Sequence, residues 1–456
     1  MSFAKRLKRI GKILIPAGFA AVTLLTMADL AQAADAPSSY REHCATCHGE
    51  ARLGGIGPAL IPENLARLRK TEAEKVIKDG RPATQMPPFG DKLSADEIKA
   101  LVDYAYAPIK PMPVWGEKEI TASRIVLEPK PLPAKPVFKA DPMNLFVVVE
   151  SGDHHVSILD GDKLEPIHRF QSRFALHGGP KFTPDGRFVY FASRDGWVTK
   201  YDLWNLKVVA EVRAGINTRN AAVSGDGKYV AVANYLPHSL VILDADLNFK
   251  KLLPVTDKDG KVSSRVSAVY DASPRQSFVA ALKDVKEVWE VSYNPKADDI
   301  PAGMIHDFKY KEGAFVPGFL NPVRTQLDDY LDDFYFTQGY DEVMGASRND
   351  AKSAISGQVV NLDARKKIAD LELPGMPHLG SGISWKWQGR TVMATPNLNE
   401  GLISIIDMAT WKTIKQIKTR GPGFFMRSHE NSRYAWTDSM MSKEFKDTMQ
   451  VIDKQT

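Results

Sequence analysis

Two cysteines and the histidine that follows them have the clearest chemistry in this sequence. Cys44, Cys47 and His48 stand in the run His43-Cys44-Ala45-Thr46-Cys47-His48, and the 456 residues contain no other cysteine. Two thiols at this spacing can form thioethers to both vinyl groups of one haem, and the adjacent imidazole can bind its iron. The alternative is a redox-active or structural Cys-x-x-C pair, which needs no histidine at that position. The run predicts one covalent haem c with His48 as a metal ligand.

Two further histidines lie in loops whose composition is unlike that of strands. His177 is in Leu176-His177-Gly178-Gly179-Pro180, and His378 is in Met376-Pro377-His378-Leu379-Gly380. The glycines allow the backbone to approach a flat ligand closely. A single loop histidine can equally be a surface or hydrogen-bonded residue. Both histidines are therefore candidate ligands, and the fold that positions them decides between these roles.

The first 33 residues predict export. Basic residues between Lys5 and Lys12 precede an apolar run from Ile13 to about Met27, and Ala31-Gln32-Ala33 offers small residues for cleavage. A transmembrane anchor is the alternative, but the run is shorter than the roughly 20 residues that span a bilayer. We expect a signal peptide over residues 1–33. Because c-type haem is attached on the exported side of a bacterial membrane, we also expect a periplasmic protein.

The mature chain has nearly balanced charge. Removing residues 1–33 takes five basic residues and one acid from totals of 60 and 55, which leaves 55 basic and 54 acidic residues. This balance gives no reason to expect nucleic acid or a membrane surface as a partner. Both cysteines are assigned to haem, so a hydrophobic core rather than a disulfide must stabilise the chain.

Residues 34–107 have the pattern of a small all-α cytochrome c domain. Helices are predicted over residues 39–47, 72–79 and 95–106, the last behind the capping box Ser94-Ala95-Asp96-Glu97. The runs Gly57-Pro58-Ala59-Leu60 and Gln85-Met86-Pro87-Pro88-Phe89 resemble two class I cytochrome c signatures. This resemblance implies that Met86 is the sixth ligand of the haem c iron. A core role for Met86, with another loop methionine or a histidine as ligand, is the alternative.

Residues 108–138 predict a linker. Seven prolines lie between Pro108 and Pro136, and Ile125-Val126-Leu127 is the one apolar stretch among them. Such a density of proline favours an extended chain with at most one strand, which could be the first strand of the next domain.

Residues 139–456 repeat a pattern of short strands and turns. Phe182-Thr183-Pro184-Asp185-Gly186 leads into an apolar strand, and the same order returns at Ser224-Gly225-Asp226-Gly227, with the two Asp-Gly turns 41 positions apart. That spacing is the length of one four-stranded propeller blade. Five weaker copies bring the count to seven and predict an all-β propeller rather than a sandwich or two smaller β domains. They start near Leu145, Val269, Phe334, Ile383 and Met426, and several copies end in a strand followed by aspartate, at Asp160, Asp363, Asp407 and Asp453.

The whole arrangement resembles a known family. A one-haem cytochrome c joined to a propeller, with a histidine before an early blade, is similar to the cytochrome c/haem d1 nitrite reductases and their relatives. Several longer runs resemble the dihydro-haem d1 dehydrogenases of haem d1 biosynthesis along nearly the whole mature chain. These runs are Leu176 to Asp185, Ser193 to Trp197, Ala214 to Asn220, Ala281 to Trp289, Leu373 to Ser384 and Gly421 to Ser428.

The resemblance implies a second tetrapyrrole, bound without covalent attachment: dihydro-haem d1 as substrate and haem d1 as product. His177 would be the proximal ligand of its iron, and His378 would be one of two histidines over the distal face. Basic side chains would hold the carboxylates of the tetrapyrrole, although each could instead be a solvated charge at a strand end. The basic residues at matching positions are Arg194, Arg219, Lys283, Arg348 and Arg427.

The implied reaction converts a propionate arm of dihydro-haem d1 to an acrylate. Two protons and two electrons leave the arm, and the electrons pass through haem c to an external one-electron acceptor. His378 is the first candidate for the base that takes a proton from carbon, and Asp332 is the second; a positioning role is the alternative for both. Apo nitrite reductase and other haem d1 assembly proteins are further candidate partners.

Three other functions stay open at this point. Nitrite reductases carry a second distal histidine in a Leu-His-Asp step, where this chain has Leu331-Asp332-Asp333, and this difference argues against nitrite reduction. A haem d1 carrier would bind the tetrapyrrole without converting it. A plain electron-transfer protein would use haem c alone.

The number of repeats differs from that of the resembling family. Haem d1 propellers close with eight blades, whereas this sequence shows seven starts. We therefore expect the chain to lack about one C-terminal blade, to retain the tetrapyrrole less firmly and to aggregate more readily than a complete relative. Residues 122–138 could supply one strand of a closing blade.

Overall fold

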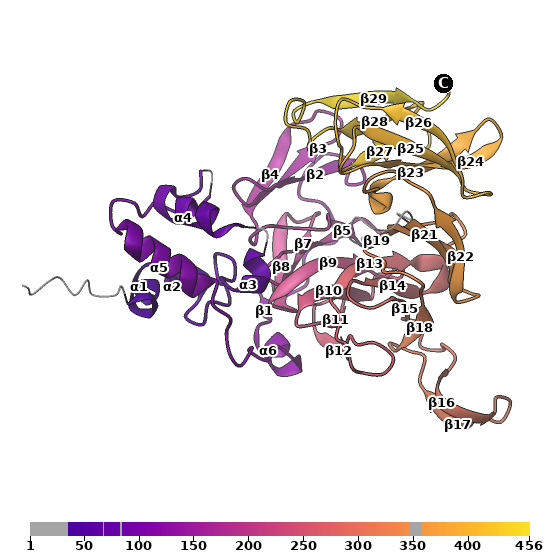
Figure 1. Cartoon of the computed structure of the whole chain (residues 1–456), viewed down its shortest axis with the longest axis horizontal. Helices are drawn as coiled ribbons and strands as arrows, with labels where there is room; N and C mark the ends of the chain where they lie inside the picture. Colours follow the sequence, from indigo (N-terminus) through magenta and orange to yellow (C-terminus); the bar gives the residue numbers. More distant parts are fainter. Residues whose placement is uncertain (1–34, 67, 83, 347–356) are drawn as a thin grey trace, which may run out of the picture.

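A helical domain is followed by a β-propeller in the computed structural model of the chain (Figure 1). The structure describes residues 35–66, 68–82, 84–346 and 357–456, so the predicted signal peptide and Arg348 lie outside the described residues. No helix in these ranges combines the length and the apolar character that crossing a membrane requires.

Short helices build the N-terminal domain. The predicted capping box begins α5: Ser94 accepts from the backbone N–H of Glu97, and the Glu97 carboxylate accepts from the N–H of Ser94. The predicted end of α4 at Gly80 is also found. The expected attachment helix is divided at Cys44, because Cys44 belongs to the last turn of one helix and precedes the first turn of the next. The helices of this domain are α1 (Ala36–His43), α2 (Ala45–His48), α3 (Pro62–Leu65), α4 (Lys70–Asp79) and α5 (Ala95–Ala105).

The linker carries more structure than its prolines predict. Helix α6 (Glu117–Ala122) begins where the Glu119 carboxylate accepts from the N–H of Gly116 at 2.9 Å. Strand β1 (Ile125–Val126) then pairs antiparallel with β8 (Lys207–Arg213). A strand at the outer edge of a blade offers unpaired backbone groups that a passing segment can cover. The suggestion that residues 122–138 supply a strand of a closing blade is therefore corrected: β1 is the fifth strand of the β5–β8 sheet.

The described residues of the propeller form seven blades, as the seven repeat starts predict. Most blades have four antiparallel strands, while the first and the last have three. Blade 1 is β2 (Leu145–Glu150), β3 (His155–Asp160) and β4 (Pro166–Gln171); blade 2 is β5 (Lys181–Phe182), β6 (Phe188–Ala192), β7 (Trp197–Asp202) and β8; blade 3 is β9 (Asn217–Val223), β10 (Tyr229–Leu236), β11 (Ser239–Asp244) and β12 (Phe249–Pro254); blade 4 is β13 (Val266–Ala272), β14 (Ser277–Leu282), β15 (Glu287–Ser292) and β18 (Pro322–Gln326); blade 5 is β19 (Asp333–Phe336), β20 (Glu342–Ala346), β21 (Gly357–Asn361) and β22 (Lys366–Leu371); blade 6 is β23 (Ile383–Trp387), β24 (Arg390–Pro396), β25 (Leu402–Asp407) and β26 (Thr413–Lys418); blade 7 is β27 (Met426–Ser428), β28 (Tyr434–Asp438) and β29 (Met449–Asp453).

Apolar side chains hold neighbouring blades together. One cluster joins blades 3 and 4, where Leu240 and Ile242 contact Phe278 and Val291, all fully buried. Similar clusters follow from blades 1 and 2 to blades 6 and 7. A hairpin of β16 (Ile300–Asp307) and β17 (Glu312–Val316) projects from blade 4, away from the helical domain (Figure 1). Blades 2 to 6 are buried on both faces by their neighbours, whereas blades 1 and 7 keep exposed apolar residues such as Phe146 and Val451. The loops at the blade ends are therefore what remains to build a site.

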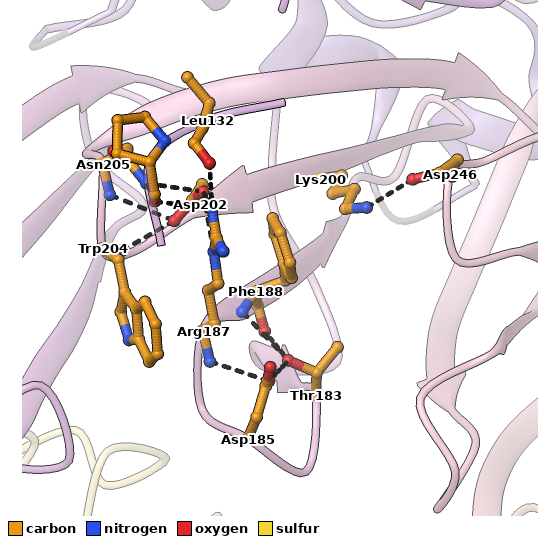
Figure 2. Close-up of polar contacts among 11 residues, drawn as sticks. Leu132, Thr183, Asp185, Arg187, Phe188, Lys200, Asp202, Trp204, Asn205 and Asp246 are labelled. Carbon is orange, nitrogen blue, oxygen red and sulfur yellow. Dashed lines mark hydrogen bonds and ion pairs between the residues drawn. The ribbon is translucent and has the colours of Figure 1, made fainter. Parts of the chain in front are cut away.

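A repeated aspartate explains the strand-plus-Asp signature. In blade 2, Asp202 is fully buried, and one carboxylate oxygen accepts from the N–H groups of Trp204 and Asn205 at 2.9 and 3.1 Å (Figure 2). The carboxylate thereby satisfies backbone donors of the turn that follows the strand. Blade 5 differs from the expectation, because Asn361 rather than Asp363 accepts the corresponding bond, from Ala364. The other turns closed by an aspartate are those after Asp160, Asp244, Asp407 and Asp453.

The same turn of blade 2 fastens the linker. Arg187 donates to the second oxygen of Asp202 at 2.8 Å and to the carbonyl oxygens of Leu132 and Pro133 at 3.3 and 3.1 Å (Figure 2). Asn205 donates to the Pro133 carbonyl at 2.9 Å. The end of the linker is thus held on blade 2 by hydrogen bonds as well as by β1.

Candidate functional site

Cys44, Cys47 and His48 line one cavity at the junction of α1 and α2. The N–H of Cys44 donates to the Tyr40 carbonyl at 2.8 Å, and the N–H of His48 donates to the Cys44 carbonyl at 2.9 Å. This helical spacing brings both thiols and the imidazole to a cavity of about 330 Å³. The donor set and its enclosure fit one haem c held by two thioethers and one imidazole.

The imidazole of His48 is fixed in the orientation that an iron ligand needs. Nδ1 lies 2.8 Å from the Pro58 carbonyl oxygen, and because that oxygen can only accept, Nδ1 carries the hydrogen. Nε2 therefore keeps a free lone pair. Burial lowers the pKa of His48, which favours the neutral form. A Cβ at position 57 would lie 2.8 Å from Cε1 of the ring, so Gly57 is required for this packing.

The environment of Cys44 does not suit a redox dithiol. Such pairs work through a thiolate with a lowered pKa, whereas burial, together with the nearby Cys47, raises the pKa of Cys44 to about 11. A buried thiol that stays protonated fits a structural or thioether role.

Met86 lines the same cavity as His48. Its carbonyl accepts from the N–H of Arg81 at 3.0 Å, and a Cβ at Gly80 would lie 2.9 Å from that carbonyl, so a glycine lets the loop close. The cavity is also lined by His43 and by His154, which comes from blade 1. Met86 as the sixth ligand therefore stays a prediction, and the histidine alternative now has two named candidates.

A second cavity, of about 630 Å³, lies where the propeller blades converge. The predicted residues His177, Arg219, His378 and Arg427 are all among its lining residues, although they come from loops and strands of different blades. The cavity also exposes apolar surface from blades 1, 2 and 7. Its lining further includes Val147, Val149, Lys181, Phe191, Tyr270, Asp333, Ser381, Phe424 and Phe425.

His177 is held like a metal-binding histidine. Its N–H donates to the Ala192 carbonyl at 2.8 Å, and its Nδ1 donates to the Arg219 carbonyl at 2.7 Å, which leaves Nε2 as the acceptor. Nε2 lies 2.5 Å from Nη1 of Arg219, so an iron atom would replace this hydrogen bond. A Cβ at Gly178 would lie 2.5 Å from Cβ of Asn220, and φ there is +86°, so only glycine suits the loop.

His378 faces the cavity beside a carboxylate. Nδ1 donates to the Phe424 carbonyl at 2.8 Å, with Ser381 Oγ 2.6 Å away, and the ring packs against that of Phe424 at 4.3 Å between centroids. Nε2 lies 3.4 Å from Oδ2 of Asp333, and the Tyr270 hydroxyl donates to Oδ1 of Asp333 at 2.9 Å. Burial and the negative charge of Asp333 raise the pKa of Tyr270, so its phenol stays protonated and donates. The arrangement can accept a proton at Nε2 and share it with a carboxylate.

Three cationic side chains line the cavity near the two histidines. Arg219 and Arg427 were predicted; Lys181 was not. Burial lowers the pKa of Lys181, and the positive charge of Arg427 adds to this lowering. Lys181 donates to the Gly178 carbonyl at 2.7 Å, and Arg427 donates to the Ser381 carbonyl at 3.1 Å. A ligand with several carboxylates would neutralise this concentration of positive charge.

Three predicted residues are not among the lining of this cavity. Lys283 and Asp332 pair with each other at 2.5 Å. The backbone of Arg194 connects the loop before His177 to β9, through the Ala175 carbonyl and the Thr218 N–H. Since successive residues of an extended chain face opposite ways, the step to Asp333 turns the next carboxylate into the cavity. Asp333 therefore lines the cavity and Asp332 does not, and the catalytic role of Asp332 stays a prediction.

Asp333, Tyr270 and Lys181 are the functional candidates that the sequence did not suggest. Lys181 follows the glycine-rich loop of His177 by a few positions, which was a usable signal. Asp333 required the register of β19, because only the alternation along that strand distinguishes it from Asp332. Tyr270 has no local signal, since it is one aromatic residue of an ordinary strand.

Comparisons with known proteins find relatives for both the helical domain and the propeller. The family model described as Cytochrome D1 heme domain matches residues 140–456, and the one described as Cytochrome C oxidase, cbb3-type, subunit III matches residues 31–104. The Dihydro-heme d1 dehydrogenase of Pseudomonas aeruginosa is 54% identical over 438 residues, 95% of this chain and 83% of that protein. The Nitrite reductase of Stutzerimonas stutzeri is 25% identical over 483 residues, 96% of this chain and 82% of that protein.

A solved structure gives the same answer for the fold. The structure described as Dihydro-heme d1 dehydrogenase NirN in complex with DHE has a TM-score of 0.83 and 54% identity to this chain, covering 92% of this chain and 84% of that one. The D1 model alone matches well over half of the sequence. The chain therefore belongs to the cytochrome D1 heme-domain family, with a cytochrome c domain at its N-terminal end.

Proposed function

We propose that this protein is a dihydro-haem d1 dehydrogenase. It binds dihydro-haem d1 in the propeller cavity, removes two protons and two electrons from one propionate arm to form the acrylate of haem d1, and passes the electrons on by way of haem c. The name and the 54% identity of the Pseudomonas aeruginosa relative support this assignment. So does the presence of both cavities in one chain.

The observation that carries the proposal is the pair of imidazoles in the propeller cavity. His177 and His378 both donate from Nδ1 to a backbone carbonyl, so that Nε2 of each ring is the nitrogen that can accept. Nε2 of His177 contacts Arg219 Nη1 at 2.5 Å. Nε2 of His378 lies 3.4 Å from the Asp333 carboxylate. One histidine is therefore equipped to bind iron and the other to move a proton.

The cationic side chains bind and orient the substrate. Lys181, Arg219 and Arg427 would each pair with a carboxylate of the tetrapyrrole, and Arg219 would exchange its contact with His177 Nε2 for one of these carboxylates as the iron binds. Phe424 and the apolar residues of β2 exclude water from the macrocycle. Holding the propionate arm at one place matters, because proton removal from carbon requires the base within hydrogen-bond reach.

Proton removal is assigned to His378 with Asp333. A saturated –CH₂–CH₂–COO⁻ arm loses one hydrogen from each carbon, as two protons and two electrons in total. Nε2 of His378 takes one proton, and the Asp333 carboxylate, held by the Tyr270 hydroxyl, stabilises the resulting imidazolium. The second proton would pass to water, and the two electrons would pass one at a time by way of haem c to the external acceptor. Asp333 thus supports the base His378, whereas the sequence suggested Asp332 as a second candidate for the base itself.

Haem c, held by Cys44, Cys47, His48 and, as we propose, Met86, supplies a one-electron acceptor next to the propeller. A methionine and histidine pair raises the reduction potential of such a haem and so favours electron acceptance. An external one-electron acceptor must then reoxidise haem c.

We infer export to the periplasm from residues 1–33 and from the covalent haem motif. Apo nitrite reductase and other haem d1 assembly proteins are candidate recipients of the product.

The decisive experiment is anaerobic incubation of the purified protein with dihydro-haem d1 and a one-electron acceptor. Mass analysis of the extracted tetrapyrrole should show the loss of two hydrogen atoms, together with reduction of the acceptor. An unchanged tetrapyrrole that stays bound would favour a haem d1 carrier. Rapid reduction of nitrite by the protein loaded with mature haem d1 would favour a nitrite reductase. We expect this reduction to be slow, because Asp332 stands where nitrite reductases carry the second distal histidine.

A further inference from the structure

The guanidinium of Arg213 is buried between the two domains. Arg213 ends β8 in blade 2, and the residue is only 6% exposed. Nε donates to the Asp195 carbonyl of the propeller at 2.8 Å, and Nη2 donates to the Leu53 carbonyl of the cytochrome c domain. The guanidinium also lies over the ring of Trp115, in the linker, at 4.7 Å. One side chain therefore joins the helical domain, the linker and the propeller.

Burial of this charge makes the contact specific to the docked arrangement. A guanidinium removed from water is costly unless its donors are satisfied. One of its acceptors, the Leu53 carbonyl, belongs to the other domain, so separating the domains would break a charge-assisted hydrogen bond inside the interface. Gly54 allows this approach, since a Cβ there would lie 3.3 Å from Nη2 of Arg213.

An apolar cluster surrounds the guanidinium. Ala59 and Ile61 of the cytochrome c domain and Ile216 of the propeller are fully buried against one another. The backbone of Arg213 is bonded as well: its carbonyl accepts from Trp115 Nε1 at 3.0 Å, and its N–H donates to Ser123 Oγ at 2.9 Å. Interfaces between domains usually allow relative motion unless they are apolar and well packed. This one has the composition of a core.

The segment 213–219 leads from this contact to both iron-binding histidines. At one end, Arg213 donates to the carbonyl of Leu53. Gly54, which follows Leu53 in the cytochrome c domain, donates from its N–H to the His48 carbonyl at 2.8 Å. In the middle, Asn217 donates to Asn64, which lines the haem c cavity, at 3.0 Å. At the other end, the Arg219 carbonyl accepts from Nδ1 of His177. The same short segment thus contacts residues that line both cofactor cavities, through the side chain of Asn217 and the backbone carbonyl of Arg219.

We propose that Arg213 is a positioning residue that locks the cytochrome c domain onto the propeller, so that segment 213–219 holds His48 and His177 at a fixed separation for electron transfer. The contact between the domains does not depend on the proposed reaction. Its role in electron transfer from the tetrapyrrole rests on the proposed function. The two domains then act as one rigid body during turnover instead of a mobile pair.

The test compares Arg213→Ala with Arg187→Ala in the full-length protein containing haem c. Arg187 is a matched control: it pairs with the buried Asp202, lies over aromatic rings and binds linker carbonyls, but its partners are all in blade 2 and the linker. Amide hydrogen exchange reports the lock directly. Arg213→Ala should increase exchange in residues 52–61 and 214–218, and Arg187→Ala should leave those segments as in the wild type.

The second measurement is the rate at which haem c is reduced after mixing with dihydro-haem d1. Arg213→Ala should slow this step about tenfold or more, since small misplacements of reacting groups are costly, with tetrapyrrole affinity and the haem c absorption spectrum unchanged. Arg187→Ala should keep the wild-type rate. Arg213→Lys keeps the charge but loses the planar fork, and should fall between the two.

Several outcomes would overturn the proposal. If residues 52–61 and 214–218 of Arg213→Ala exchange as in the wild type, Arg213 does not hold the domains together. If their exchange increases but haem c is reduced at the wild-type rate, the contact has no role in electron transfer. If Arg213→Ala does not fold, Arg213→Lys gives the same two readings. A wild-type protein that never reduces its haem c would contradict the dehydrogenase function, while the exchange comparison would still decide on the lock.

Discussion

The haem c cavity takes its thiols and its histidine from five consecutive residues, Cys44 to His48, whereas the propeller cavity takes its histidines from positions 177 and 378 and its carboxylate from position 333. In the first case a single helical turn creates the geometry, and the rest of the domain only encloses it. In the second case the two histidines and the carboxylate come from different blades, so several blades must pack correctly before they share one cavity. A covalent site can tolerate loose surroundings, while a site assembled from distant loops depends on the fold at every point.

The largest expected effect is the loss of one cofactor while the other cavity still binds its ligand. The double variant Cys44→Ala, Cys47→Ala should lose all covalent haem, because no other thiol is available, and should still bind the d1-type tetrapyrrole in the propeller. Electron output should stop. Absorption spectra after denaturation measure the covalent haem, and titration with dihydro-haem d1 measures binding. Continued turnover with a one-electron acceptor would remove haem c from the mechanism.

The next effect tests the iron ligand of the propeller. His177→Ala should change the absorption spectrum of bound tetrapyrrole and weaken binding by more than the roughly 10–100-fold that loss of a second-shell partner costs. The bands of haem c should not move, since His48 is held separately by Pro58. An unchanged tetrapyrrole spectrum would place the proximal ligand elsewhere.

A third prediction uses the adjacent acids as a matched pair. Asp333→Asn should lower kcat by about 10²-fold, the lower range for loss of acid–base support, because Nε2 of His378 loses its carboxylate. Asp332→Asn disturbs the ion pair with Lys283 and should leave kcat near the wild-type value. Steady-state kinetics on both variants, with dihydro-haem d1 as substrate, checks the assignment. The reverse ranking would restore Asp332 as the base candidate.

The smallest effect concerns stability at the boundary between the domains. Burial raises the pKa of Asp195 from 3.8 to about 6, although Ser193 and Arg213 oppose the rise. The folded state therefore binds a proton more tightly than the unfolded state, and the free energy of unfolding falls by about 2 kcal/mol as pH rises from about 4 to about 6.

The variant Asp195→Asn removes this ionisation. Chemical denaturation of wild type and variant at pH 4 and pH 6.5 should show the wild type losing stability relative to the variant by about that amount. If the free energy of unfolding changes equally in both proteins between pH 4 and pH 6.5, Asp195 is not the group that causes the loss of stability.

Much of the fold was predictable because its signals are local. The repeat starts near Leu145, Ile383 and Met426 coincide with the first residues of β2, β23 and β27, since strand alternation and turn residues act over a few positions. The Ser94 capping box was equally local. Helix α6 was missed, because six residues among prolines carry too weak a helical signal against the compositional signal of a linker.

The site was less predictable than the fold. Loop composition was enough to select His177 and His378, but the choice between Asp332 and Asp333 depended on strand register, which the sequence leaves open. Lys283, which the family resemblance implies as a basic residue of the channel, pairs with Asp332 and is not among the residues that line the cavity. Arg213 was not singled out in the sequence; only the tertiary structure reveals that another domain covers it.

The pairing of β1 with the outer edge of β8 has a consequence for assembly. The cytochrome c domain is tethered through a segment already fastened to blade 2 by strand pairing and by Arg187. The free part of the tether is therefore short, which keeps the effective concentration of the domain at its docking surface high. In a variant with a weakened interface, the cytochrome c domain would leave and rebind the propeller of its own chain many times before it could reach another molecule. Mixing separately produced domains would consequently understate how firmly they associate within one chain.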